Sequence, residues 1–191
     1  LIEFAENSVD FQHFSPLHGE MFLPWTGIKV PGLEVRHAAR WVLDEERPHV
    51  AWFLNDAQLF AFGREVPRSG ASAKICIDGP GGLVSFHFDI PDVGKITLIQ
   101  THTPIAPMTQ DVRFRWYADR GMPRWLASYV VGNWLSQWCE DVRLWESKVY
   151  RERPMLVKGD GPVHPMRKWY RRFYEQPGVA LGRKHDAVGT G

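Results

Sequence analysis

The 191-residue chain has few cysteines, almost no net charge and no long hydrophobic run. Its two cysteines, Cys76 and Cys139, form no CxxC pair, which argues against a disulfide framework, a cysteine zinc site and a complete iron–sulfur site. The 23 basic and 22 acidic residues leave a net charge of +1, so we expect no nucleic-acid partner. No stretch approaches the roughly 18 apolar residues that a membrane-spanning helix needs.

The residues that are abundant are apolar and aromatic. A hydrophobic content of 44% is enough for one domain with its own core. Nine Trp and eleven Phe are more aromatic bulk than packing usually requires, and such residues favour large, flat, apolar ligands. The chain starts without Met or a secretory signal, so we expect a fragment or a processed piece of a longer protein.

Local patterns predict an α+β fold. Residues 3–18 have helical spacing, with a break or loosening at Ser15 and Pro16. Short β-branched and aromatic runs separated by turn clusters, including Asn55-Asp56, then indicate an antiparallel sheet. The expected strands are residues 33–43, 49–54, 59–62, 73–77, 83–90, 95–103 and 111–117.

The C-terminal third contains the longest predicted helix. After Pro123 the chain runs to residue 150 without another proline, which favours one long helix. A shorter helix is expected over residues 165–174, with its basic residues on a solvated face, and residues 177–191 form a mobile tail. We expect one domain, residues 1–176, in which the long helix lies across the concave face of the sheet, a helix-grip (START-like) arrangement.

Two histidines near the start are candidate metal ligands. His13 and His18 stand five residues apart, and Asp10 precedes His13 by three. On a regular helix Asp10 and His13 fall about 60° apart, but the two histidines fall about 140° apart. A distortion at Pro16 would be needed to bring both imidazoles to one ion.

A third ligand is expected on the long helix. Trp134, Trp138, Asp141 and Trp145 follow one another at helical spacing, so Asp141 lies on a tryptophan-lined stripe. A lone buried carboxylate is costly unless it is paired or bound to a metal. Two imidazoles and one carboxylate make the facial triad of ferrous oxygenases, although spacing alone also fits a buried histidine pair and a hydrogen-bonded core Asp.

The stretch from Glu6 to His18 resembles the signature of Rieske non-haem iron oxygenases: Glu-Asn, then Asp, two residues, His, four residues, His. The resemblance implies that His13, His18 and Asp141 hold a mononuclear Fe²⁺ ion. It also implies that Asp10 is the bridging catalytic acid that couples this iron to the [2Fe–2S] Rieske cluster of a neighbouring subunit, within a homotrimer.

The C-terminal half narrows the resemblance. LIQTHTPIAPMTQDV and EDVRLWESKVYRERPMLVKGDGPVHPMRKWYRRFYEQ are similar to the cholesterol 7-desaturase (Neverland-type) group, and the ending is shared with 3-ketosteroid 9α-hydroxylases. The implied partners are a sterol or steroid, O₂, and an electron-donating reductase or ferredoxin. Outside enzymes, the alternative is a sterol- or lipid-binding module without metal.

One departure from that family is large. The Cys-x-His and Cys-x-x-His pairs that hold the Rieske cluster do not occur, so we expect the N-terminal Rieske domain to be absent from this chain. Such a piece could not turn over alone. An intracellular location, with membrane association at the endoplasmic reticulum in a eukaryote through an anchor outside this chain, is the matching expectation.

A sterol pocket needs flat apolar walls and one polar contact. The candidate walls are Phe86, Phe88, Trp52 and Trp134, and the candidate polar contacts are His102, His87 and Thr101. Strand alternation places Phe86 and Phe88 on one face and His87 on the other, so these residues cannot all serve.

Overall fold

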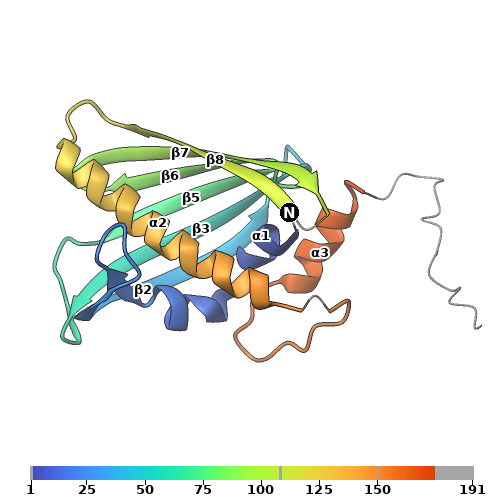
Figure 1. The fold of residues 1–191 in the computed structure, drawn as a ribbon, viewed down its shortest axis with the longest axis horizontal. Helices are drawn as coiled ribbons and strands as arrows, with labels where there is room; N and C mark the ends of the chain where they lie inside the picture. Colours follow the sequence, from blue (N-terminus) through green and yellow to red (C-terminus); the bar gives the residue numbers. More distant parts are fainter. Residues whose placement is uncertain (1, 108, 150, 175–191) are drawn as a thin grey trace, which may run out of the picture.

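The computed structural model describes residues 2–107, 109–149 and 151–174, so the predicted tail, residues 177–191, lies outside the described residues. An eight-stranded antiparallel sheet curls into a half-barrel and is accompanied by helices at both ends of the chain (Figure 1). This confirms the α+β class. The strands are β1 Glu20–Phe22, β2 Lys29–Leu43, β3 Val50–Ala61, β4 Arg64–Glu65, β5 Ala71–Asp78, β6 Leu83–Ile90, β7 Gly94–Ala106 and β8 Thr109–Ala118.

Successive hairpins build the sheet in the order β1-β2-β3-β5-β6-β7-β8, with β4 paired to β3. The turn predicted at Asn55-Asp56 is wrong, because β3 continues through these residues. Asn55 pairs with Ala39 of β2 on one side and with Ala73 of β5 on the other. Pairing on both sides satisfies the backbone of β3 and outweighs the turn preference of the two residues.

The predicted opening helix is divided. It consists of α1, Ile2–Asn7, a 3₁₀ turn η1, Phe11–His13, and a π turn η2, Phe14–His18. The regular helix therefore ends well before Ser15, and the expected loosening takes the form of the π turn.

Two helices follow the sheet. Helix α2, Arg124–Ser147, is long, and α3, Val163–Arg171, begins two residues before the predicted start. Figure 1 shows α2 running in front of the strands, and its Trp134 ring meets the rings of Phe86 and Trp116 edge-on. No helix in the described part of the chain is both long enough and apolar enough to cross a membrane.

The core lies between the inner face of the sheet and the helices. Strand alternation turns one set of side chains inward, and the buried ones include Phe53, Ile75, Phe86 and Leu98. Trp169 of α3 is buried against Trp41 of β2. This packing holds α1, α2 and α3 to one face of one sheet, where the candidate site is also found.

Candidate metal centre and cavity

The π turn brings the two N-terminal histidines together. A π turn joins residues i and i+5, which is the separation of His13 and His18 in the sequence. Their ring centroids lie 5.1 Å apart. The spacing that converges poorly on a regular helix therefore converges here, because the turn is wider.

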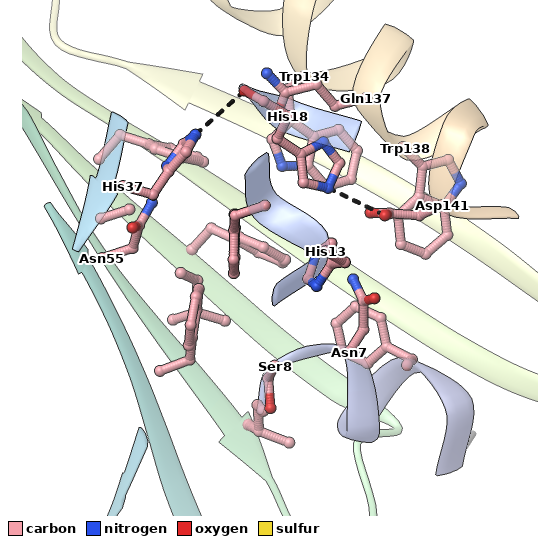
Figure 2. A pocket seen from close by; sticks show the side chains of 18 residues that line it. Asn7, Ser8, His13, His18, His37, Asn55, Trp134, Gln137, Trp138 and Asp141 are labelled. Atoms are coloured by element: carbon pink, nitrogen blue, oxygen red, sulfur yellow. Dashed lines mark hydrogen bonds and ion pairs between the residues drawn. The ribbon is translucent and has the colours of Figure 1, made fainter. Parts of the chain in front are cut away.

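Asp141 approaches this pair from α2. Its Oδ1 lies 3.1 Å from Nε2 of His18, and all three side chains are buried. One possible ligand atom from each of His13, His18 and Asp141 lies within 4.8 Å of the others. Figure 2 shows the three side chains converging, His13 from the end of the 3₁₀ turn, His18 from the π turn and Asp141 from α2.

The ring nitrogens of His13 and His18 are arranged in a way that suits a bound cation. Nδ1 of His13 donates to the backbone carbonyl of Asp10, while Nε2 of His13 and Nδ1 of His18 are buried and lack a partner among the described residues. Burial, with His18 nearby, lowers the pKa of His13 and so favours the neutral imidazole that binds metal. The donor set of two imidazoles and one carboxylate fits ferrous iron.

Asp10 takes part in the site through its backbone. Its carbonyl fixes the ring and tautomer of His13, as a hydrogen-bond partner behind a metal ligand commonly does. The half-buried Asp10 carboxylate has no hydrogen-bond partner among the described residues. Its role as a bridging acid stays a prediction.

A cavity of about 140 Å³ adjoins the three ligands. Its walls come from α1, the π turn, α2 and the inner faces of β2, β3, β5 and β6. They are largely aromatic and aliphatic, with a few polar side chains. The predicted wall residues Phe86, Phe88 and Trp134 line it, and the polar lining residues include Asn7, Gln137, His37 and Asn55.

Two predicted substrate contacts do not line this cavity. Trp52 lies on the opposite face of β3 from Phe53, and its Nε1 donates to Asp44 at 2.9 Å. His102 is buried against Phe4 and Trp138, with its ring centroid 4.5 Å from that of Phe4. Trp52 therefore lies one residue away from the inward-facing positions of β3. His102 contacts two residues of the cavity wall, Phe4 and Trp138, without lining the cavity itself.

The other two polar candidates are also elsewhere. His87 is exposed and its Nε2 meets Ser85 Oγ at 3.1 Å on the outer face of β6. Thr101 pairs with Leu83 and Arg113 and is absent from the cavity walls. Neither residue reaches the site.

The sequence reasoning missed His37 and Asn55. Nε2 of His37 lies 3.3 Å from the carbonyl oxygen of His18, and its Nδ1 lies 3.0 Å from Nδ2 of Asn55. Alternation with Ala39 and Trp41 along β2 could have placed His37 on the inner face. The contact with Asn55 is diagonal between paired strands and depends on their register.

A buried ion pair anchors the segment that carries the histidines. Glu6 of α1 accepts from Nε of Arg167 at 2.6 Å and from Nζ of Lys148 at 2.9 Å. Burial raises the pKa of Glu6, but the hydrogen bonds from Arg167 and Lys148 outweigh it and leave the pKa lowered. The expectation that Arg167 lies on a solvated face is wrong, because Glu6 draws it inward.

Known proteins that are similar to this chain are named as enzymes that act on sterols or steroids. The family described as "3-Ketosteroid 9alpha-hydroxylase C-terminal domain" matches residues 1–174. The chain is 30% identical over 182 residues to a cholesterol 7-desaturase of Hemicentrotus pulcherrimus, covering 91% of this chain and 38% of the relative. A cholesterol 7-desaturase of Caenorhabditis elegans is 29% identical over 185 residues, covering 91% and 42%.

A bacterial relative is more distant. The oxygenase component of a 3-ketosteroid-9-alpha-monooxygenase from Rhodococcus rhodochrous is 23% identical over 180 residues, covering 90% of this chain and 44% of the relative. The chain thus spans less than half the length of these curated relatives.

Proposed function

The chain belongs to the family of 3-ketosteroid 9α-hydroxylase C-terminal domains, and on this premise we propose that it is the mononuclear-iron catalytic domain of a sterol oxygenase or desaturase. The observation that carries the proposal is the convergence of His13, His18 and Asp141 beside a largely apolar cavity. Oxidoreductases with sterol or steroid substrates are the named members among its relatives.

In this proposal His13, His18 and Asp141 hold Fe²⁺ on one face. Iron, when bound, supplies the O₂-dependent oxidation of a C–H bond. The residues of the chain hold and orient the metal ligands. The Asp10 carbonyl keeps the hydrogen of His13 on Nδ1 and leaves Nε2 free to bind metal. Phe86, Phe88 and Trp134 exclude water and present flat apolar surfaces to a fused-ring substrate.

The cavity must enlarge to admit a sterol. At about 140 Å³ it is smaller than the roughly 300–1,000 Å³ typical of pockets for drug-sized ligands. The rings of Trp134 and Trp138 on α2 are stacked with centroids 5.5 Å apart, and both line the cavity. In the helix-grip arrangement that we infer, with α2 across the concave face, displacement of these two rings opens the space.

Electrons reach the site from outside this chain in our proposal. Neither cysteine begins a Cys-x-His or Cys-x-x-His pair, so a [2Fe–2S] Rieske cluster would be carried by another domain or subunit. Asp10, next to the ligand segment, is the proposed link to that cluster in a homotrimer. A reductase or ferredoxin completes the supply, and the isolated chain is expected to bind iron without turning over.

The preferred reaction is 7-desaturation of cholesterol. The cholesterol 7-desaturase relatives are 25–31% identical to the chain, whereas the 3-ketosteroid 9α-monooxygenase component is 23% identical. Hydroxylation at C9 of a 3-ketosteroid is the second candidate. A lipid-binding module without metal leaves His13 Nε2 and His18 Nδ1 buried without partners, which is unfavourable.

Iron content tests the proposal. The chain is loaded with Fe²⁺ under anaerobic conditions, desalted and analysed for metal beside its His13→Ala and Asp141→Ala variants. We expect about one iron per chain, lost in both variants, from the three-ligand site. His87→Ala, on the outer face of β6, is the matched control and should keep its iron. A parent chain that binds no iron contradicts the oxygenase proposal.

A further inference from the structure

Asn55 and His37 form a hydrogen-bonded pair on the inner face of the sheet. Both line the cavity, and Figure 2 shows them on the side away from Asp141. The walls of this side are small: Asn55 stands between Ala39 on β2 and Ala73 on β5, which pair with it directly. Directly paired residues have Cβ atoms about 5 Å apart, so two methyl groups leave room around the carboxamide.

The orientation of the Asn55 carboxamide follows from the His18 carbonyl. A carbonyl oxygen only accepts, so Nε2 of His37, 3.3 Å away, carries the hydrogen and donates. In that tautomer Nδ1 of His37 is an acceptor, and it faces the Asn55 amide nitrogen at 3.0 Å. One of the two amide N–H groups of Asn55 therefore donates to His37. This contact fixes the carboxamide with its nitrogen toward His37 and its Oδ1 on the other side.

Asn55 Oδ1 is buried and has no hydrogen-bond partner among the residues that the structure describes. A buried acceptor without a partner is unfavourable, and native proteins rarely keep one unless a ligand or an ordered water satisfies it. The atom can only accept, so the group that completes it must donate. A hydroxyl meets this requirement and a ketone does not.

We propose that Asn55 Oδ1 accepts a hydrogen bond from the hydroxyl of a sterol, so that the cavity selects a 3-hydroxysteroid over the matching 3-ketosteroid. This inference rests on the proposed sterol site and names its substrate class. A 3-keto oxygen placed here would face the lone pairs of Oδ1, with neither atom able to donate. A mismatched ligand leaves the buried Oδ1 unpaired and therefore binds more weakly than a matched one.

The test compares two steroids that differ only at C3. 5α-Cholestan-3β-ol and 5α-cholestan-3-one, delivered from cyclodextrin, are titrated into the full chain while tryptophan fluorescence is followed. Trp134 and Trp138 line the cavity and report occupancy. We expect the alcohol to bind about tenfold more tightly, the effect of one buried hydrogen bond gained rather than left unmade.

Two variants test the assignment to Asn55. Asn55→Leu removes the acceptor at similar volume and should bring the two affinities within about twofold of each other. His37→Phe frees the amide N–H of Asn55 to turn toward the ligand, so the ketone should gain affinity and the preference should narrow. Gln100→Leu removes another buried carboxamide, one that is absent from the cavity walls, and should keep the preference.

The outcomes separate the two proposals. Equal affinity of the unaltered chain for both steroids overturns the hydroxyl inference and leaves the sterol site standing. A tenfold preference that survives Asn55→Leu also overturns it, because another donor or acceptor must then be responsible. Binding of neither steroid overturns the sterol site and the inference together, whereas iron content reports on the metal centre independently.

Discussion

Nε2 of His18 lies 3.1 Å from Oδ1 of Asp141, although 123 positions separate the two residues in the sequence. The histidine belongs to a π turn near the N-terminus and the aspartate to helix α2 near the C-terminus. The whole antiparallel sheet is formed by the chain between them. The candidate metal centre is therefore closed only when the turns before the sheet and helix α2 after it come together.

Asp141→Asn should lower the affinity for Fe²⁺ by more than about 100-fold, because losing a ligand exceeds the 10–100-fold cost of losing a partner behind one. The amide keeps the shape of the side chain, so the chain should remain folded. Competition against a chelator of known affinity measures the change. Glu140→Gln is the control, because Glu140 pairs with Arg143 and is absent from the cavity walls, and this variant should bind iron as the parent does.

Gly19→Ala should weaken iron binding through the backbone. A Cβ on Gly19 would meet the carbonyl oxygen and backbone of Ser15, inside the π turn that sets His13 beside His18. The turn must then open, and we expect a loss of at least about tenfold in iron affinity. Gly121→Ala is the control, since a Cβ there meets nothing within 4 Å. Unchanged affinity in Gly19→Ala would show that the histidines tolerate another turn geometry.

His102 should make the stability of the fold depend on pH. Burial lowers the pKa of His102 to about 4, although a hydrogen bond to Gln110 acts in the opposite direction. Between pH 4 and the unfolded value of about 6.5 the unfolded chain binds the extra proton, so stability falls as pH is lowered through this range. Over this range the free energy of unfolding should fall by about 3 kcal/mol because of His102.

His102→Phe keeps an aromatic ring against Phe4 and removes the titrating group. Urea denaturation at pH 7.5 and at pH 5 should show a smaller loss of stability in the variant than in the parent. An equal loss in both proteins would assign the pH dependence to other groups.

Arg167→Met should cost about 3–5 kcal/mol of stability, because it removes the closest cation from the buried Glu6 carboxylate. Lys148 remains 2.9 Å from Glu6 and keeps the cost toward the lower end. The double variant Glu6→Leu with Arg167→Met should be less destabilised than the sum of the two single variants. Chemical denaturation of the four proteins gives the coupling free energy, and a coupling near zero would contradict the ion pair.

The fold class could be predicted because the local residue pattern clearly indicates strands and turns. Short β-branched runs with turn clusters between them indicate antiparallel strands, and each expected strand lies largely within an observed one. The errors occur where tertiary pairing outweighs local preference. Residues 49–54 and 59–62 belong to one strand, since β2 and β5 pair with Asn55-Asp56 from both sides.

Only those residues of the candidate site that carry a local pattern or motif could be predicted from the sequence. His13, His18 and Asp141 were found from spacing, from a tryptophan stripe and from a family resemblance, and the structure brings them together. Trp52 was predicted as a flat apolar wall of the pocket, but strand alternation places it on the opposite face of β3 from Phe53. His37 and Asn55 carry no motif, so nothing local marked them.

The sequence by itself determined the ligand types, their order along the chain, the antiparallel texture and the family, because these depend on residue identity and near neighbours. Tertiary structure decided the rest. It set the π turn that brings His13 to His18, the docking of α2 that delivers Asp141, and the register that joins His37 to Asn55. The last two of these contacts join residues far apart in the chain or on different strands, and only the packing of the whole sheet fixes their geometry. The π turn is local, but its geometry departs from the regular helix that the sequence pattern predicts.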